Sequence, residues 1–431
     1  MKSRAQRVLF PDIEAPPDNS VKSSSTFVNN MAVPVHRWFR YSAGFSAEWV
    51  SQVIARAKAE RPIRVFDPFT GSGTTLLAAE SEGVPSYGVE SHPFVSRVAR
   101  AKLAWRTDPE CYRARIGELR YLAKSLKPST AGYPALIYKC YDDQALGDLD
   151  CLRQAYEMTQ DGTPTSELAW LTLVGILRKT SHAGTAQWQY VLPRKQKRSP
   201  QDAFAAFDEF SRMIFRDMVS GQSLSGPRAG FIESDARTCS EIPEDFANLV
   251  VTSPPYPNNY DYADATRLEM SFMREISGWG DLQDKVRQHL VRSCSQHVPE
   301  RAVDLDETLA SPEVAPIRSE LERVCRDLAE VRKTKGGKKT YHLMIACYFR
   351  DLAQVWFALR RICAPGARVC FVIGDSAPYG VYVPVIPWLG VLAEAAGFQS
   401  FHFERTRARN VKWKNRKHRV PLQEGHLWVE G

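Results

Sequence analysis

Short apolar runs alternate with amphipathic segments in the first quarter of the chain, and this alternation predicts strands and helices in turn. Residues 63–66 form an apolar run of strand length, 74–82 have helical spacing, and 86–89 form a second strand-like run. An amphipathic helix is predicted at 47–59, with Ser46 as its N-cap. A strand, a helix and a second strand in this order predict the start of a parallel sheet with crossover helices.

The same alternation returns after residue 230. A long helix is predicted at 341–362, and another at 387–396 ends at Gly397. Residues 364–366, Ala-Pro-Gly, are predicted to form a turn between the long helix and the strand after it. The strands predicted in this part are 231–233, 248–252, 367–373, 400–404 and 426–429.

The stretch between the two parts lacks this alternation. Residues 105–230 are predicted to be mostly helical, most clearly at 166–178, with a polar loop at 180–200. A single doubly wound α/β domain with helical insertions is therefore the predicted fold class. The chain is predicted to begin with a flexible arm at 1–32, which is rich in Pro, Ser, Asp and Asn. A first part of the sheet follows at 33–104, and then the helical insertion at 105–230, which could recognise a target. A second part of the sheet covers 231–431 and contains a basic insertion at about 276–340.

The composition narrows the class of protein. The 431 residues are 44% hydrophobic and 25% charged, which is ordinary for a globular chain. No apolar run is long enough to span a membrane, and residues 1–11 lack the apolar segment of a secretory signal. The nine cysteines include no Cys-x-x-Cys pair, so neither a structural zinc site nor a disulfide framework is expected, which fits a reducing cytosol. The formal net charge of +8 favours a polyanionic partner where the charges cluster.

A glycine-rich turn follows the first predicted strand, in the sequence Asp67-Pro68-Phe69-Thr70-Gly71-Ser72-Gly73-Thr74-Thr75. Gly71 and Gly73 permit positive φ and remove side chains that would keep a ligand away from the backbone. The helix that begins here offers free backbone N–H groups, and Ser72 and Thr74 add hydroxyl groups. A phosphate-binding loop would end in Gly-Lys-Ser or Gly-Lys-Thr, which this turn lacks, so a different polar ligand is predicted.

A second motif follows the predicted strand at 248–252. There Ser253-Pro254-Pro255-Tyr256 combines a hydroxyl group, two prolines and an aromatic ring. The prolines fix φ and remove N–H donors, so the carbonyl of Pro254 is held without competition. Both motifs stand where a predicted strand ends, and open α/β sheets bind their ligands outside such strand ends.

Together the two motifs resemble those of the DNA amino-methyltransferases, which transfer a methyl group from S-adenosyl-L-methionine to an exocyclic amine of cytosine or adenine. Residues 35–46 are similar to the family's N-terminal element on the cofactor side, and 369–376 to a later strand of its sheet. The resemblance covers roughly 33–100 and 230–430 and implies a Rossmann-like class I methyltransferase sheet. The cofactor motif comes first here, whereas many relatives with Ser-Pro-Pro-Tyr have the permuted order.

The resemblance implies that 33–104 carries much of the cofactor site. Asp67 is expected to take the ammonium group of the methionine part. Glu90, an acid at the end of the second strand about 20 residues after the turn, is expected to accept the ribose hydroxyls. Asp235 is the candidate for the adenine amino group, with an ordinary exposed loop residue as the alternative. The residues expected at the cofactor are Phe45, Asp67, Phe69, Thr70, Gly71, Ser72, Gly73, Thr74, Glu90 and Asp235, and no metal ligand is expected.

The second motif suits methylation of an exocyclic amine, whose lone pair is delocalised into the ring. Ser253 Oγ and the carbonyl of Pro254 could accept both amine hydrogens and push the nitrogen toward sp³ geometry. Tyr256 would stack on the base, which has to leave the duplex first. The predicted catalytic residues are thus Ser253, Pro254, Pro255 and Tyr256, and the methyl group moves by direct in-line displacement. A ring-carbon cytosine methyltransferase would need a Pro-Cys nucleophile, and the chain has no Pro-Cys dipeptide.

The target base is inferred from the first residue of the tetrapeptide. Family members with Ser there mostly methylate N4 of cytosine, and those with Asp or Asn mostly methylate N6 of adenine. Ser253 therefore favours N4-cytosine methylation of duplex DNA, in a restriction-modification or phage-defence setting in the prokaryotic cytosol, where a cognate restriction endonuclease could be a partner. N6-adenine methylation is the nearest alternative, RNA base methylation a more distant one, and a non-catalytic DNA-binding protein on a methyltransferase fold the alternative outside the enzymes. No oligomeric state is predicted.

Three basic clusters with aromatic residues nearby are the predicted DNA contacts. An ordinary solvated surface is the alternative for any one of them. The clusters are Arg194, Lys195, Lys197 and Arg198, then Arg332, Lys333, Lys335, Lys338 and Lys339, and finally Arg405, Arg407, Arg409, Lys412, Lys414, Arg416, Lys417 and Arg419 with Trp413 among them.

Overall fold

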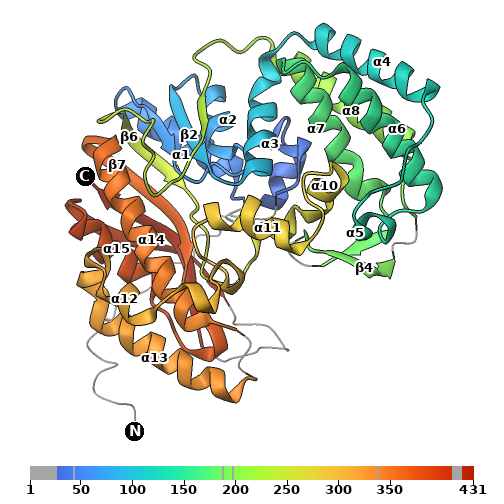
Figure 1. Ribbon diagram of the computed structural model, residues 1–431. Coiled ribbons are helices and arrows are strands. Elements are labelled where there is room, and N and C mark those ends of the chain that lie inside the picture. The colour runs from blue at the N-terminus through green and yellow to red at the C-terminus, as the bar shows by residue number, and fades with distance from the viewer. Residues whose placement is uncertain (1–26, 42–43, 187–188, 197–198, 337–338, 410–419) are drawn as a thin grey trace.

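The computed structural model describes residues 27–41, 44–186, 189–196, 199–336, 339–409 and 420–431. Within these residues the central element is a sheet of seven strands in the order β5-β2-β1-β6-β7-β9-β8 (Figure 1). The strands are β1 Val65–Asp67, β2 Ser86–Glu90, β5 Gly230–Glu233, β6 Ala247–Thr252, β7 Cys363–Gly374, β8 Ser400–Arg409 and β9 Leu422–Glu430. A separate hairpin consists of β3 Ala183–Thr185 and β4 Val191–Gln196.

The first five strands in this order are parallel, and β9 runs antiparallel between β7 and β8. This confirms the predicted doubly wound α/β class, and a mostly parallel seven-stranded sheet with an antiparallel hairpin at one side is typical of the class I methyltransferase fold. The strand order reverses at β1, which pairs with β2 on one side and with β6 on the other. The turn after Asp67 and the tetrapeptide after Thr252 therefore begin side by side, at the switch point where such sheets bind ligands.

The helices are α1 Ala47–Glu60, α2 Thr74–Ser81, α3 Pro93–Leu103, α4 Pro109–Ser125, α5 Ala135–Tyr138, α6 Asp143–Thr159, α7 Pro164–Thr180, α8 Ala203–Gly221, α9 Tyr262–Ala265, α10 Arg267–Phe272, α11 Trp279–Lys285, α12 Leu305–Ala310, α13 Arg318–Thr334, α14 Tyr341–Ile362 and α15 Val385–Ala395. Short 3-10 helices are η2 Phe27–Ala32, η3 His36–Trp38, η4 Ala104–Arg106, η6 Arg287–His289, η7 Ser295–His297, η8 Glu300–Ala302, η9 Pro312–Ile317 and η10 Pro378–Gly380. The long helix predicted at 341–362 is confirmed as α14.

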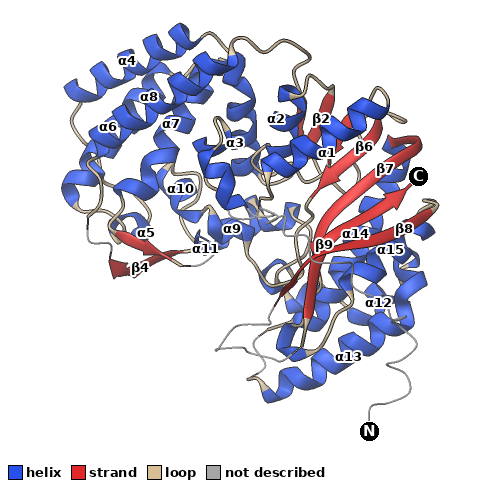
Figure 2. Cartoon of the chain, turned by 180° about the vertical axis from the view of Figure 1, so that it is seen from behind, coloured by secondary structure: helices blue, strands red, loops and turns tan. Residues whose placement is uncertain are grey.

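Different helices cover the two faces of the sheet (Figures 1 and 2). On one face, Leu249 and Val251 of β6 pack in one core with residues of α1 and α2. On the other face, Val250 packs in a second core with residues of α14 and α15. Successive side chains of a strand point to opposite faces, so β6 is buried on both, as parallel strands usually are.

Helices α4, α6, α7 and α8 form a bundle beside the sheet, and most of 105–230 is helical as predicted (Figure 1). Helix α7 lies at its centre, and its Trp170 and Leu173 are fully buried. The polar loop predicted at 180–200 is wrong in part, because this segment contains the β3–β4 hairpin. The buried positions are few, Ala183 and Gly184 on β3 and Val191 on β4, and the exposed residues of β4 conceal any alternation.

The segment between the tetrapeptide and α14 divides between two cores. Residues of α10 and α11 pack in the core of the helical bundle, whereas residues of α12 and α13 pack against α14. This segment thus connects the bundle to the face of the sheet that α14 covers. In the described parts of the chain, no helix combines the length and apolar character needed to cross a membrane.

Two further predictions differ from the structure. The turn predicted at 364–366 belongs to β7, where Gly366 has φ of 70° and the pairing with β6 shifts register between Ala247 and Leu249. The flexible arm predicted at 1–32 does not extend to 27–32, which form η2, and there Asn30 is 1% exposed. Residues 1–26 lie outside the described residues.

Candidate active site

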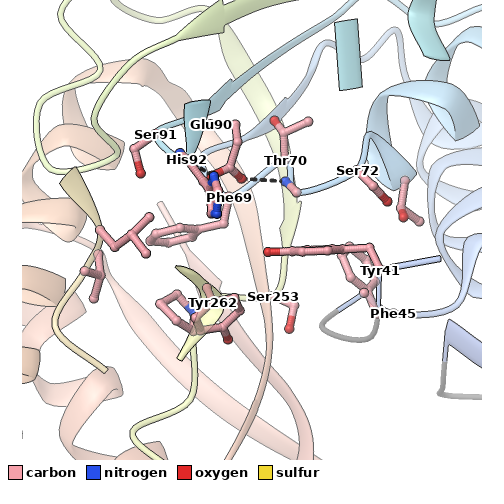
Figure 3. A pocket seen from close by; sticks show the side chains of 16 residues that line it. Tyr41, Phe45, Phe69, Thr70, Ser72, Glu90, Ser91, His92, Ser253 and Tyr262 are labelled. Atoms are coloured by element: carbon pink, nitrogen blue, oxygen red, sulfur yellow. Dashed lines mark hydrogen bonds between the residues drawn. The ribbon is translucent and has the colours of Figure 1, made fainter. Parts of the chain in front are cut away.

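A pocket opens where β1, β2 and β6 end (Figure 3). Its lining comes from five places in the sequence: the segment before α1, the β1–α2 turn, the end of β2 with the residues after it, the residues after β6, and the two residues Leu290 and Val291 after η6. Figure 3 shows Tyr41, Phe69, Glu90, Ser253 and Tyr262 extending toward this common space. The lining residues are Tyr41, Gly44, Phe45, Phe69, Thr70, Gly71, Ser72, Thr74, Glu90, Ser91, His92, Ser253, Pro255, Tyr262, Leu290 and Val291.

The glycine turn has the backbone conformation that its sequence predicts. Gly71 has φ of 53°, and Gly73, the N-cap of α2, has φ of 94°. A Cβ on Gly71 would lie 3.1 Å from Cε1 of Tyr41, so the turn approaches the opposite wall too closely for a side chain. The hydroxyl of Ser72 is buried in the lining and has no hydrogen-bond partner among the described residues. A buried, unpaired hydroxyl at the wall of a pocket fits a polar ligand that supplies the missing hydrogen bond.

Glu90 joins two parts of the pocket wall. One carboxylate oxygen accepts the N–H of Gly71 at 2.8 Å, and the other accepts the N–H of His92 at 2.9 Å. Burial raises the pKa of Glu90 to about 7, against the lowering effect of these two amides. A carboxyl group with this pKa can exchange its proton near neutral pH, and it stands where a ribose hydroxyl could be bound.

Asp67 lies behind the pocket rather than in its lining, and it is fully buried. Its Oδ1 accepts the hydroxyl of Thr252 at 2.6 Å and the N–H of Phe69 at 3.0 Å. Its Oδ2 is buried and has no hydrogen-bond partner among the described residues. Burial raises the pKa of Asp67 to about 6, and the hydrogen bond from Thr252 opposes this rise. The unpaired oxygen fits a cationic or N–H donor in a ligand.

Ser253 stands at the exit of β6 with its hydroxyl oriented. Its Oγ donates a hydrogen bond of 3.1 Å to the carbonyl oxygen of Val372 on β7. Because the single hydroxyl proton is used in this bond, the lone pairs of Oγ remain available as acceptors. Pro255 lines the pocket beside it, and Pro254 is buried behind the lining.

Tyr256 and Asp235 lie outside the pocket lining. The guanidinium carbon of Arg409 lies 5.6 Å from the ring centre of Tyr256, which is half-buried. Arg237 binds both carboxylate oxygens of Asp235 at 2.6–2.9 Å, in a neighbouring cavity that Arg292 and Arg350 also line. In the sequence, the Arg two residues after Asp235 could have indicated this ion pair.

Sequence reasoning missed part of the lining. Tyr262 follows the tetrapeptide by six positions, and the tyrosines at 260 and 262 were a usable signal for an aromatic wall. Leu290 and Val291 carry no motif that could have indicated them. His92 is buried, its Nε2 pairs with Oγ1 of Thr266 at 3.0 Å, and burial lowers its pKa to about 4, so this ring is neutral at pH 7.

The predicted DNA contacts lie on three elements. Arg194 and Lys195 are exposed on β4, Lys333 is near the end of α13 and Lys335 just beyond it, and Arg409 ends β8, where it pairs with Glu424 at 3.3 Å. Lys339 is half-buried before α14. Lys197, Arg198, Lys338, Lys412 and Lys414 lie outside the described residues, as do Arg416, Lys417 and Arg419. In the part of the chain that the structure describes, no group of three or more His, Cys, Asp and Glu residues could hold a metal ion.

Comparison with known proteins finds distant relatives of this chain among the type II methyltransferases. The chain is 25% identical to the type II methyltransferase M.BsoBI of Geobacillus stearothermophilus over 408 residues, which are 85% of this chain and 79% of the relative. It is 24% identical over 409 residues to the type II methyltransferase M.AvaI, both of Nostoc sp. and of Anabaena variabilis, covering 86% of this chain and 81% of the relatives. No family model matches the chain.

The similarity to solved structures is more remote. Two structures of the rRNA methyltransferase aviRa from Streptomyces viridochromogenes align with 90% of this chain and 84% of theirs, at 11% and 10% identity, with TM-scores of 0.27 and 0.29. Scores this low carry no argument about function. The sequence relatives do: the chain is a distant homologue of type II methyltransferases, and this homology implies S-adenosyl-L-methionine as the methyl donor.

Proposed function

We propose that this protein is a type II DNA methyltransferase that transfers a methyl group from S-adenosyl-L-methionine to the N4 amine of cytosine in duplex DNA. The observation that carries the proposal is the orientation of Ser253. Its hydroxyl proton is given to the carbonyl of Val372, so its Oγ is an acceptor on the wall of the same pocket as the glycine turn and Glu90. An acceptor in this position suits an exocyclic amine.

The residues of the first wall would hold the cofactor. Gly71 lets the backbone approach it, Ser72 offers an unpaired hydroxyl, and Phe69 offers an apolar surface. Glu90 would accept ribose hydroxyls, and the buried Asp67 lies behind this wall, where its negative charge would attract the ammonium group. When bound, S-adenosyl-L-methionine supplies an electrophilic methyl group. The remaining members of this proposed set are Phe45, Thr70, Gly73, Thr74 and Asp235, of which Gly73 acts through the backbone and Asp235 would have to release Arg237.

The residues of the second wall would prepare the amine. Ser253 Oγ and the carbonyl of Pro254 accept its two hydrogens, which localises the nitrogen lone pair for attack in line with the methyl group. The reaction needs no covalent enzyme intermediate. Pro255 keeps this backbone rigid because its ring fixes φ.

The target base has to leave the duplex to reach this pocket. An aromatic ring next to Ser253 would hold it by stacking. Tyr262 is in the pocket lining, and Tyr256 is next to Arg409 behind it, so both rings are candidates for this role.

Basic side chains around the pocket would bind the DNA backbone. Arg194 and Lys195 come from β4 of the β3–β4 hairpin, whereas Lys333 and Lys335 come from the segment before α14 (Figure 1). Lysine and arginine contacts to phosphates supply affinity without sequence information. The proposed set also contains Lys197, Arg198, Lys338, Lys339, Arg409, Lys412 and Lys414.

Two relatives named as type II methyltransferases favour a restriction-modification setting in a prokaryotic cytosol, with a cognate restriction endonuclease as partner. Acceptors at 253 and 254 would serve either amine. The choice of N4-cytosine over N6-adenine therefore rests only on the presence of Ser at position 253. N6-adenine is therefore the second candidate.

The deciding experiment identifies the methylated base. DNA incubated with the protein and S-adenosyl-L-methionine carrying a labelled methyl group is digested to nucleosides, which are identified by mass spectrometry. N4-methylcytosine supports the proposal. N6-methyladenine retains the enzyme class and refutes the base, and bound cofactor without any methylated nucleoside favours a non-catalytic DNA-binding protein.

A further inference from the structure

One wall of the pocket belongs to a segment outside the sheet. We name residues 27–41 and 44–46 the N-terminal strap. Tyr41, Gly44 and Phe45 of the strap line the pocket, and the ring of Tyr41 lies where a Cβ on Gly71 of the glycine turn would come within 3.1 Å of it. The position of the strap therefore sets the width of the pocket opposite the glycine turn (Figure 3).

One carboxylate of the helical bundle binds the strap through several hydrogen bonds, in addition to the packing of Val35 and Trp38 in the core of the bundle. Asp217 lies on α8, and its side chain is 3% exposed. Its Oδ2 accepts the N–H of Val35 at 3.2 Å, Nε of Arg37 at 3.0 Å and the indole N–H of Trp38 at 2.8 Å. Its Oδ1 forms an ion pair with the guanidinium group of Arg37. Four donors from three residues of the strap, Val35, Arg37 and Trp38, thus converge on one side chain more than 170 positions away in sequence.

Other contacts support the same stretch. The side-chain amide of Gln189, just before β4, donates to the carbonyl of Arg40 at 3.0 Å. Lys102 of α3 donates to the carbonyl of His36 at 3.0 Å and is 1% exposed. The bundle and α3 thus hold the strap immediately before Tyr41.

The other end of the strap is attached to α1. The amide nitrogen of Asn30 donates to the carbonyl of Phe45 at 2.8 Å, and its Oδ1 accepts the N–H of Ala47 at 2.9 Å. This clamp fixes Phe45 relative to the first turn of α1. The pocket wall is therefore fixed at one end to the sheet side of the molecule and at the other to the helical bundle.

We propose that Asp217 is a positioning residue for cofactor binding, through which the helical bundle holds the Tyr41–Phe45 wall against the glycine turn. This rests on the proposed function, because it takes the pocket to be the site of S-adenosyl-L-methionine. Asp217 touches neither cofactor nor base. Its effect passes through Arg37 and Trp38 to Tyr41, so its loss widens the pocket without changing Ser253.

A carboxylate is needed at this place because its oxygens accept from three or more donors at once. In Asp217→Asn one oxygen is replaced by an NH₂ group, which brings a donor against donors of the strap. The charge that pairs with Arg37 is also lost. The substitution conserves the size of the side chain, so α8 keeps its packing.

The test compares Asp217→Asn with Asp208→Asn by calorimetric binding of S-adenosyl-L-methionine to the full-length protein. Asp208 is a matched control: it lies on the same helix and binds Arg120 at 3.0 and 3.3 Å, but Arg120 belongs to α4 of the bundle. We expect Asp217→Asn to raise Kd for the cofactor about tenfold, as loss of one charge-assisted hydrogen bond would. KM for the cofactor rises similarly, while kcat at saturating cofactor stays as in the parent. Asp208→Asn leaves Kd unchanged.

Three outcomes would overturn the proposal or its premise separately. Equal Kd in the two variants, with the parent binding normally, refutes the role of Asp217. A fall in kcat at saturating cofactor without a change in KM refutes action through the cofactor wall. If the parent does not bind S-adenosyl-L-methionine, the proposed function fails first.

A milder substitution covers the case in which Asp217→Asn does not fold. Trp38→Phe removes the indole N–H that bonds to Asp217 and keeps a buried aromatic ring. We expect it to raise Kd about threefold. Trp170→Phe, in the same core but with an indole nitrogen that has no hydrogen-bond partner in the described chain, is its control and should leave Kd unchanged. Equal effects of the two tryptophan substitutions would also refute the proposal.

Discussion

The hydroxyl of Thr252 donates a hydrogen bond of 2.6 Å to Oδ1 of Asp67, and this bond joins the first residue of the glycine turn to the residue that precedes the tetrapeptide. Asp67 ends β1 and begins the glycine turn, and Thr252 ends β6 and precedes Ser253. The glycine turn and Ser253 are therefore fixed to one another at a fully buried position. Under the proposed function, a small displacement here would separate the methyl donor from its target.

We expect Thr252→Val to destabilise the protein. The substitution keeps the shape of the side chain but removes a donor from a buried carboxylate that already has one unpaired oxygen. The expected loss in the free energy of unfolding is about 1–3 kcal/mol, which urea denaturation would measure. Thr334→Val, which removes an exposed hydroxyl at the end of α13, is the control and should change stability by much less. Equal losses would show that the bond to Asp67 contributes nothing.

The affinity for S-adenosyl-L-methionine should increase as pH rises from about 5.5 to 7.5. Burial raises the pKa of Glu90 to about 7 and that of Asp67 to about 6. In this window both carboxyls lose protons while the ammonium group of the cofactor stays charged, and a bound cation and ribose hydroxyls favour the carboxylate form. Binding therefore releases protons, so Kd falls with rising pH.

The pH dependence has a matched control. Burial also raises the pKa of Glu275 to about 7, but Glu275 is absent from the pocket lining. Glu90→Gln should weaken binding and flatten its dependence on pH, whereas Glu275→Gln should leave both as in the parent. A Kd that does not change between these pH values in the parent would contradict the assignment of Glu90.

Ser253→Ala should slow methyl transfer and leave cofactor binding unchanged. It removes one acceptor for the amine hydrogens, and loss of a single transition-state hydrogen bond in other enzymes costs about 10²-fold in kcat. Single-turnover labelling of DNA would measure the rate, and calorimetry the Kd. Ser91→Ala, which removes another hydroxyl from the lining, should keep the rate. A normal rate in Ser253→Ala would refute the role of this hydroxyl.

The sequence predicts most of what lies at the sheet. The two motifs follow strands, and because β1 and β6 are adjacent in a doubly wound order, their carboxyl ends bring Gly71 and Ser253 into one pocket. Local sequence signals were enough to predict this part of the pocket, because each motif has recognisable turn residues and follows a recognisable strand.

The remaining wall depends on contacts that no local pattern contains. Arg40, next to Tyr41, is held by Gln189 far along the chain, and Leu290 reaches the pocket from a segment without a motif. The hairpin at β3–β4 escaped prediction because β3 is only three residues long and most of β4 is exposed. Asp235 is at the predicted strand exit, but its carboxylate is taken by Arg237, a competition between neighbours that the position of an acid does not reveal.

The basic residues at the end of α13 should contribute to DNA affinity without regard to sequence. Replacing Lys333 and Lys335 together by Gln should weaken binding to all duplexes, and the slope of log K against log salt should become shallower by up to about 2. Arg56 and Lys58 are exposed near the end of α1, which leads to the N-terminal end of β1. They form a charge-matched control. If both double variants behave alike, the α13 end is an ordinary solvated surface and the β4 residues Arg194 and Lys195 become the next pair to test.

The aromatic ring that holds the extruded base can be identified by comparing two tyrosines. Tyr262 is in the pocket lining with Ser253, whereas Tyr256 of the tetrapeptide is beneath Arg409 and outside the lining. Stacking of a base on an aromatic ring contributes about 1–3 kcal/mol, so Tyr262→Ala should lower kcat/KM for DNA by about 5- to 150-fold. Tyr256→Ala should lose less.

Tyr→Phe at each position keeps the ring and should retain most of the activity, which separates stacking from the hydroxyl group. Calorimetric Kd for S-adenosyl-L-methionine is measured in all four variants, because Tyr262 also lies near Glu90. A larger loss in Tyr256→Ala, with cofactor binding intact, would assign the stacking to the tetrapeptide ring and would mean that Tyr256 turns into the pocket when DNA is bound. Equal, small losses in both alanine variants would mean that neither ring holds the base.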